Sequence, residues 1–238
     1  MTYEGHDQLL AMREARNYNG MLERLLQKWL WPYPTLLDIG AGLGDFALRM
    51  QEHHGHEVIA LEPDAAQRDA MQRLGLSTVD SIKALREPVD AAYSLNVLEH
   101  IEDDVVAVTE WASCIRRGGL LVIYVPAFMV LYSAMDKAVG HYRRYTREQL
   151  ALVVMKAGMT VVQSGYADSL GFPASLAMRL RPDHWKGDLK PEQVRFYDRA
   201  VFPVSRMLDL VASPFFGKNV WVVARKSPSS PRRVRIFL

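Results

Sequence analysis

The chain has 238 residues, of which 49% are apolar and 24% are charged, and its formal net charge is +2. This length allows one substantial core, and the charge is too small to indicate a nucleic-acid-binding protein, in which basic residues gather on one face. The longest apolar run, residues 119–132, contains Pro126 and is too short for a transmembrane segment. With one cysteine, Cys114, and no signal peptide, a cytoplasmic protein is expected.

From residue 35 onwards, short apolar runs alternate with amphipathic stretches, which is typical of an α/β protein with a mostly parallel sheet. The first five runs are each followed by a connection of helical length. We therefore expect a seven-stranded Rossmann-like sheet with helices on both faces. The expected strands are 35–40, 57–63, 76–81, 90–96, 119–126, 159–166 and 218–226, and the expected helices between them include 44–54, 64–74, 101–116 and 147–157.

Three regions lie outside this alternation. Residues 1–31 are expected to form an N-terminal helical lid before the domain at 32–226, and residues 227–238 to form a flexible basic tail. Within the domain, residues 167–217 are expected to form a helical insertion or cap before the last strand. Apolar residues there recur at helical spacing, which indicates either core packing or a face for a dimer or a membrane, and a proline should kink the helix. These residues are Val194, Tyr197, Val201, Val204 and Leu208, with Pro203 among them.

A glycine-rich loop, "LLDIGAGLGDF", ends the first expected strand and opens a helix. Gly40, Gly42 and Gly44 let the backbone turn tightly and approach a ligand. The dinucleotide fingerprint would have a third glycine where Asp45 stands, and a carboxylate there would repel a pyrophosphate. The carboxylates of Asp45 and Asp38 together favour a cationic cofactor instead. The pattern D-x-G-x-G-x-G resembles motif I of the class I S-adenosylmethionine-dependent methyltransferases.

Polar residues end the next three expected strands, where open α/β sheets bind ligands. Glu62 can accept hydrogen bonds from both ribose hydroxyls, Asp80 is placed for the adenine amino group, and the Asn96 carbonyl for the methionine part. Each has a structural alternative when taken alone, such as a helix cap or a turn. The full set expected to bind S-adenosylmethionine is Asp38, Gly40, Ala41, Gly42, Gly44, Glu62, Pro63, Asp80, Ser81, Asn96, Val97 and His100.

Nearly the whole chain resembles a bacterial group of class I methyltransferases often found beside, or fused to, glycosyltransferases. The segments that carry this resemblance include "EARNYNGML", "LDIGAGLGDF", "LNVLEHIEDD", "LYSAMDKAVGHYRRYT" and "FGKNVWVVARK". The resemblance implies a final antiparallel strand and methyl transfer to a hydroxyl or amine of a small molecule or glycan. A homodimer or a glycosyltransferase partner is in keeping with it.

The segment "NVLEH" also resembles the E-x-x-E-H site thought to hold a divalent ion in some ubiquinone-pathway methyltransferases. Glu99 and His100 are present, but Asn96 stands at the first position. A hard cation prefers several charged oxygens, so one carboxylate and one histidine are a thin ligand set. The sequence therefore predicts no metal, with Glu99 and His100 lining the cofactor pocket.

The stretch "GHYRRYTREQL" combines a helix start with candidates for the acceptor site. Thr146 and Gln149 fit a capping box, which leaves residues 141–145 in a loop that passes over the cofactor's methyl group in this fold. His141 is either a general base that orients the acceptor or a histidine that shapes the loop.

The arginines of this loop either bind a carboxylate or phosphate of the acceptor or pair with Asp136 or Glu99 to hold the loop. Two tyrosines, one of them in the lid, are expected to close the pocket. The expected acceptor-binding set is Tyr18, Tyr132, Arg143, Arg144 and Tyr145.

These observations predict a methyltransferase acting on an oxygen or nitrogen of a small polar molecule, such as a sugar or specialised metabolite. One alternative is methylation of an envelope glycan or lipid-linked intermediate. Another is a cofactor-binding partner subunit without turnover.

Overall fold

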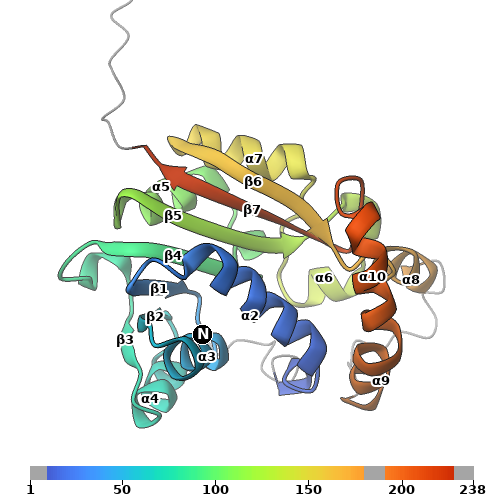
Figure 1. Cartoon of the computed structure of the whole chain (residues 1–238), viewed down its shortest axis with the longest axis horizontal. Helices are drawn as coiled ribbons and strands as arrows, with labels where there is room; N and C mark the ends of the chain where they lie inside the picture. The colour runs from blue at the N-terminus through green and yellow to red at the C-terminus, as the bar shows by residue number, and fades with distance from the viewer. Residues whose placement is uncertain (1–9, 180–190, 228–238) are drawn as a thin grey trace, which may run out of the picture.

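The computed structural model describes residues 10–179 and 191–227, and seven strands form one sheet at its centre (Figure 1). The strand order is β3-β2-β1-β4-β5-β7-β6. The first five strands are parallel, whereas β7 runs antiparallel to both of its neighbours. The strands are β1 Thr35–Ile39, β2 Glu57–Leu61, β3 Ser77–Val79, β4 Val89–Leu95, β5 Ile115–Pro126, β6 Met159–Ala167 and β7 Asn219–Lys226. The expected seven-stranded sheet with an antiparallel last strand is confirmed.

Helices cover both faces of the sheet because the strands carry apolar side chains on each face, and both faces must therefore be buried. In β1, Leu36 belongs to a hydrophobic cluster that contains residues of α2, α3 and α4, whereas Leu37 belongs to a second cluster that contains residues of α5 and α7. The helices are α2 Arg16–Leu30, α3 Asp45–His54, α4 Ala65–Arg73, α5 Asp104–Ser113, α6 Ala134–Ala138, α7 Arg147–Lys156, α8 Gly171–Arg179, α9 Pro191–Phe196 and α10 Phe202–Ala212.

Two connections differ from the expected pattern. The third strand ends at Val79 and is followed by a short 3-10 turn, Ile82–Ala84, so the expected helix-length connection after it is wrong. The helix expected at 101–116 begins only at Asp104, because Asp103 caps it by accepting a hydrogen bond from Val106 N (3.1 Å).

The described parts of the insertion before β7 are mainly helical, whereas residues 180–190 of it lie outside the described residues. Its proline acts differently from the expectation. Residues Tyr197–Val201 form a π-helical turn between α9 and α10, and Pro203 lies in the first turn of α10, where a missing N–H costs nothing. The predicted apolar stripe divides as a result. Val194 is buried, whereas Val204 and Leu208 are 55% and 42% exposed.

The N-terminal helix is joined to this insertion. Asp198, in the π-helical turn, accepts hydrogen bonds from the backbone N–H groups of Asn17 and Tyr18, both at 2.9 Å. These donors belong to the first turn of α2, which has no side-chain cap of its own, so a carboxylate from a distant segment stabilises the helix start. The sequence gives no sign of this contact.

Within the described ranges, no helix is long and apolar enough to cross a membrane. The predicted basic tail falls almost entirely on residues 228–238, outside the described residues. The first nine residues of the predicted lid lie outside them as well.

Candidate functional site

The loop after β1 depends on glycine for steric reasons. Gly40, Gly42 and Gly44 have φ angles of +72°, +55° and +78°. A Cβ on Gly40 would lie 2.5 Å from Val97 Cγ2, and one on Gly44 would lie 2.8 Å from Met71 Cγ. The glycines therefore allow both the left-handed backbone and the close approach of β4 and α4 to the loop.

Glu62, just after β2, holds the same loop from the other side. Its Oε2 accepts from Gly42 N (2.9 Å) and its Oε1 from Asp64 N (3.0 Å). Each carboxylate oxygen has a second lone pair for a ligand hydroxyl. The geometry fits the expected role of Glu62 towards a ribose.

Asp38 is 4% exposed near the end of β1 and borders the same cavity. Burial raises the pKa of this carboxyl to about 7, and the negative charge of Glu62 adds to the effect. A buried carboxyl in this state becomes an anion when a positive charge approaches. The pocket's chemistry therefore suits a cationic ligand.

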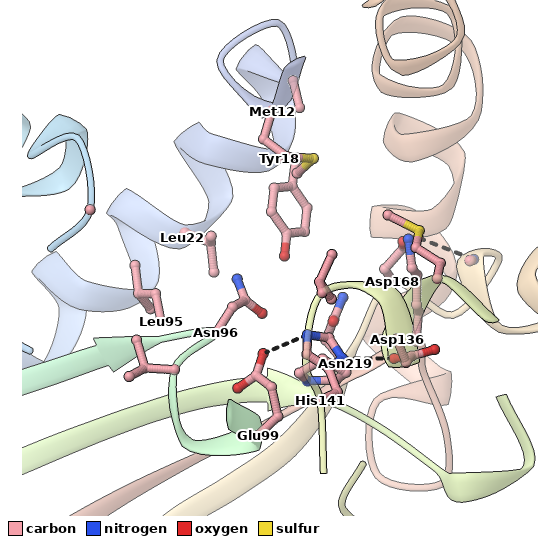
Figure 2. Close-up of a pocket in the computed structure, with 18 of the residues that line it drawn as sticks. Met12, Tyr18, Leu22, Leu95, Asn96, Glu99, Asp136, His141, Asp168 and Asn219 are labelled. Atoms are coloured by element: carbon pink, nitrogen blue, oxygen red, sulfur yellow. Dashed lines mark hydrogen bonds and ion pairs between the residues drawn. The ribbon is translucent and has the colours of Figure 1, made fainter. Parts of the chain in front are cut away.

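The glycine loop forms one end of a cavity of about 2190 Å³. This volume exceeds the roughly 300–1,000 Å³ of a pocket for one small ligand, so a cofactor and an acceptor fit together. Strands, lid and insertion all contribute to its wall (Figure 2). The predicted cofactor residues that line it are Asp38, Gly40, Ala41, Gly42, Glu62, Pro63, Asn96, Val97 and His100.

Three predicted cofactor residues lie outside this lining. Gly44 packs against α4 behind the loop. Asp80 and Ser81 are exposed and are bonded to each other through Ser81 Oγ and Asp80 Oδ1 (2.9 Å). Their contact with an adenine stays a prediction.

At the other end of the cavity, His141 is held by a carboxylate. Its Nδ1 lies 2.8 Å from Asp136 Oδ1, and Arg144 donates to both oxygens of the same carboxylate at 2.8 and 3.0 Å (Figure 2). Although burial alone would raise it, the hydrogen bonds from His141 and Arg144 hold the pKa of Asp136 well below its usual range. Of the alternatives for Arg144, pairing with Asp136 is therefore the one present, and Arg144 still borders the cavity.

Glu99 lies next to this group and is fully buried. Neither of its carboxylate oxygens has a hydrogen-bond partner among the described residues, and Oε1 lies 3.9 Å from His141 Nε2. Burial raises the pKa of Glu99 to about 8. The ring of His100 packs edge-on against His141, with centroids 4.6 Å apart, and burial lowers the pKa of His100 to about 4.

The other predicted acceptor residues divide into two groups. Tyr18 and Tyr132 line the cavity, and Tyr132 donates to the carbonyl of His141 (2.7 Å). Arg143 and Tyr145 do not line it; both donate to Asp104 Oδ2, at 2.9 and 3.0 Å, and so fix the loop to α5. The loop thus combines contacts to the cavity with contacts that hold its shape.

Several cavity residues were not in the predicted set. The sequence indicates Asp136 only as a partner for an arginine, whereas in the structure its carboxylate binds both His141 and Arg144. Its spacing of five residues from His141 matches no regular pattern that would have shown this. Others come from the insertion and its neighbours, where the sequence predicted helices but not their direction: Asp168, Tyr197, Asp198, Phe202 and Asn219.

Comparison with known proteins places this geometry in a family. The family model described as "Methyltransferase domain" matches residues 9–164. No curated protein matches the sequence significantly.

Solved structures share the fold at low sequence identity. An S-adenosylmethionine-dependent methyltransferase from Archaeoglobus fulgidus is 16% identical over 92% of this chain and 99% of that chain, with a TM-score of 0.58. Geranyl diphosphate C-methyltransferase from Streptomyces coelicolor A3(2), solved with S-adenosyl-L-homocysteine, is 14% identical over 87% and 80%, with a TM-score of 0.59. A chain from the complex between the Haloferax volcanii Trm112 methyltransferase activator and a putative methyltransferase is 14% identical. The match covers 96% of this chain and 99% of that chain, with a TM-score of 0.59.

The family match covers more than half of the chain, and the seven-stranded sheet agrees with the fold expected from the sequence. The chain therefore belongs to the methyltransferase-domain family, with the fold and S-adenosylmethionine cofactor of the class I methyltransferases.

Proposed function

We propose that this protein transfers a methyl group from S-adenosylmethionine to an oxygen or nitrogen of a small polar molecule. The observation that carries this proposal is the continuous cavity, which joins the glycine loop and Glu62 at one end to the His141–Asp136 pair at the other. An enzyme of this kind must mainly align two reactants, and a shared cavity supplies that alignment.

At the cofactor end, S-adenosylmethionine supplies a methyl group that its sulfonium activates. Glu62 accepts hydrogen bonds from the ribose, and Asp38 provides negative charge beneath a cationic ligand. The loop backbone at Gly40 and Gly42 comes close to the ligand because no Cβ stands in the way.

At the acceptor end, Asp136 holds the Nδ1–H of His141, which leaves Nε2 to face the cavity. This nitrogen orients an acceptor hydroxyl or amine and takes its proton. Tyr132 supports the His141 carbonyl, and Tyr18 covers the cavity from the lid.

The test is incubation with methyl-labelled S-adenosylmethionine and fractionated extract of the source cell. Label in a polar, low-molecular-weight product that is lost with His141→Ala supports the proposal. A His141→Ala variant that is folded, binds cofactor and transfers methyl at the normal rate contradicts the role of His141. Binding of cofactor without any labelled product favours the partner subunit without turnover.

Methylation of an envelope glycan or lipid-linked intermediate is the second candidate, and one feature favours it. Helix α10 and the turn after it expose large apolar side chains, of which Leu210 is 84% exposed and Met207, Val211 and Phe215 are each 73% exposed. An apolar face of this kind beside the cavity would bring the enzyme to a lipid surface. Label in the lipid fraction, together with sedimentation of the protein with vesicles, would favour this candidate.

A further inference from the structure

Three potential metal ligands meet at the acceptor end of the cavity. One ligand atom each from Glu99, His100 and His141 lie within 4.8 Å of one another. The edge of a tetrahedral zinc site is about 3.3 Å, given metal–ligand bonds of about 2.0–2.1 Å. Small side-chain rotations are therefore enough to close this group around an ion.

The state of Glu99 is the second observation. Its side chain is completely buried, and neither oxygen has a hydrogen-bond partner among the described residues. Figure 2 shows this carboxylate directed at His141, with a separation of 3.9 Å between Oε1 and Nε2. Buried polar groups without partners are rare and call for an explanation, such as an ion that the group ligates.

Both histidines are supported in the way that metal-bound imidazoles are. His141 has Asp136 on Nδ1 at 2.8 Å, which leaves Nε2 for a metal, and His100 is hydrogen-bonded to the backbone at Val139 and Gly140. The two loops are also joined directly, since Tyr142 N donates to the carbonyl of Glu99 (2.8 Å). The ligands thus stand on backbone that is already fixed.

A second Glu-His-His group on the surface shows what a salt-bridge cluster looks like in this protein. Glu23 lies near His53 and His54, but its oxygens already bind both histidines at 2.9 Å and Arg49 at 3.1 Å. In the buried group, by contrast, neither oxygen of Glu99 has a hydrogen-bond partner among the described residues, and His141 Nε2 is 3.9 Å from Oε1. The carboxylate of Glu99 is therefore available to a ligand, whereas that of Glu23 is already occupied.

We infer that Glu99, His100 and His141 bind one divalent transition-metal ion of the Zn²⁺ type. Two imidazoles and one carboxylate are a ligand set suited to Zn²⁺, Co²⁺ or Fe²⁺, and all three residues line the cavity in which the acceptor is proposed to bind. The expectation of no metal counted only Glu99 and His100, because the third ligand comes from a loop 41 residues further along the chain.

This inference deepens the proposed function, on which it rests for the place of the acceptor. With the ion bound, His141 Nε2 would hold the ion instead of taking the acceptor's proton, so this part of the proposed function would be replaced. The ion would polarise an acceptor hydroxyl, which would then lose its proton more easily. The proton then passes to solvent, and the oxygen attacks the methyl carbon as the bond from that carbon to sulfur breaks. Binding of the ion itself requires no methyl transfer.

The test is equilibrium dialysis of the chelator-treated full chain against Zn²⁺, with Co²⁺ absorption as a signature of histidine ligation. We expect Glu99→Gln and His141→Gln each to weaken binding by more than about 100-fold, and Asp136→Asn by about tenfold. His54→Gln, in the surface cluster, is the matched control and should bind as the unchanged chain does. If circular dichroism shows that either of the first two variants is unfolded, His100→Gln takes its place and is expected to weaken Zn²⁺ binding in the same way.

Unchanged Zn²⁺ affinity in folded Glu99→Gln and His141→Gln overturns the inference, as does loss of the ion in His54→Gln alone. Methyl transfer and binding of S-adenosylhomocysteine are measured on the same samples. Intact ion binding without any methyl transfer counts against the proposed function only, and methyl transfer without ion binding counts against the metal only.

Discussion

The two ends of the cavity are built differently. The cofactor end is formed by the backbone of the glycine loop together with two carboxyl groups from consecutive strands, Asp38 near the end of β1 and Glu62 just after β2. The acceptor end is made of side chains from separate segments around residues 99–100 and 132–144, and residues of the N-terminal helices and of the insertion also line the cavity. Backbone conformation therefore fixes the shape of the cofactor end, whereas contacts between distant side chains fix the shape of the acceptor end.

The largest loss of cofactor affinity is expected from a substitution in the glycine loop. In Gly40→Ala, the new Cβ would lie 2.5 Å from Val97 Cγ2 on a residue with φ of +72°. We expect binding of S-adenosylhomocysteine to weaken by more than about 100-fold, because the loop must move out of contact with the ligand. Isothermal titration calorimetry measures this.

Gly55→Ala is the matched control, since Gly55 has the same φ of +72° and nothing within 4 Å of a new Cβ. It should cost about 1 kcal/mol of unfolding free energy and leave cofactor affinity unchanged. Equal loss of affinity in both variants would show that general instability, and not the shape of the loop, is responsible.

A smaller effect is expected when only the charge of Glu62 is removed. Glu62→Gln keeps one acceptor oxygen but replaces the other with a donor that faces a backbone N–H. We expect cofactor affinity to fall by roughly 10- to 100-fold, or about 1.5–3 kcal/mol for hydrogen bonds to a charged group. Glu57→Gln, at the exposed start of the same strand, should bind normally in the same titration.

Asp38 should make the affinity of the cofactor end for S-adenosylmethionine depend on pH. Its pKa is raised to about 7 by burial, and the negative charge of Glu62 adds to the effect. As pH rises through 7 the carboxyl becomes an anion, so affinity for S-adenosylmethionine should increase by several-fold between pH 6 and 8. Asp38→Asn should show a flat profile over this range, and a sloped one would assign the dependence to another group.

The same shift has a consequence for stability. The folded state favours the protonated carboxyl of Asp38, so its contribution is fully present below the unfolded pKa near 4 and is lost as pH rises towards 7. Without cofactor, the unfolding free energy of the unchanged chain should therefore fall relative to Asp38→Asn over this interval. Urea denaturation at a series of pH values tests this sign.

The smallest effect concerns the cover over the acceptor end. Asp198→Asn weakens the hydrogen bonds to Asn17 N and Tyr18 N, at a cost of about 1 kcal/mol. We expect amide exchange in the first turn of α2 to quicken several-fold, with partial recovery when S-adenosylhomocysteine is bound. Asp69→Asn, on the exposed side of α4, is the control and should leave this exchange rate unchanged. If neither Asp198→Asn nor the bound ligand changes the exchange rate, the proposal of a lid that becomes ordered on cofactor binding is contradicted.

The same division explains what could be predicted. Glu62 and the glycines were found because strand ends and φ-positive turns leave local signals within about ten residues. The capping box was found for the same reason: Thr146 Oγ1 accepts from Gln149 N, and Gln149 Oε1 accepts from Thr146 N. Asp136 and Asp198 left no such signal, because each acts on a segment whose position only the folded chain defines.

The sequence by itself determined the order of strands and helices, the glycine loop and the kind of cofactor, since apolar periodicity and backbone conformation are local properties. Only the tertiary structure decided that Arg144 pairs with Asp136, that Arg143 and Tyr145 turn away from the cavity, and that His141 meets Glu99. The connections that follow β4 and β5 converge there, and the position of each side chain depends on packing that no single segment contains.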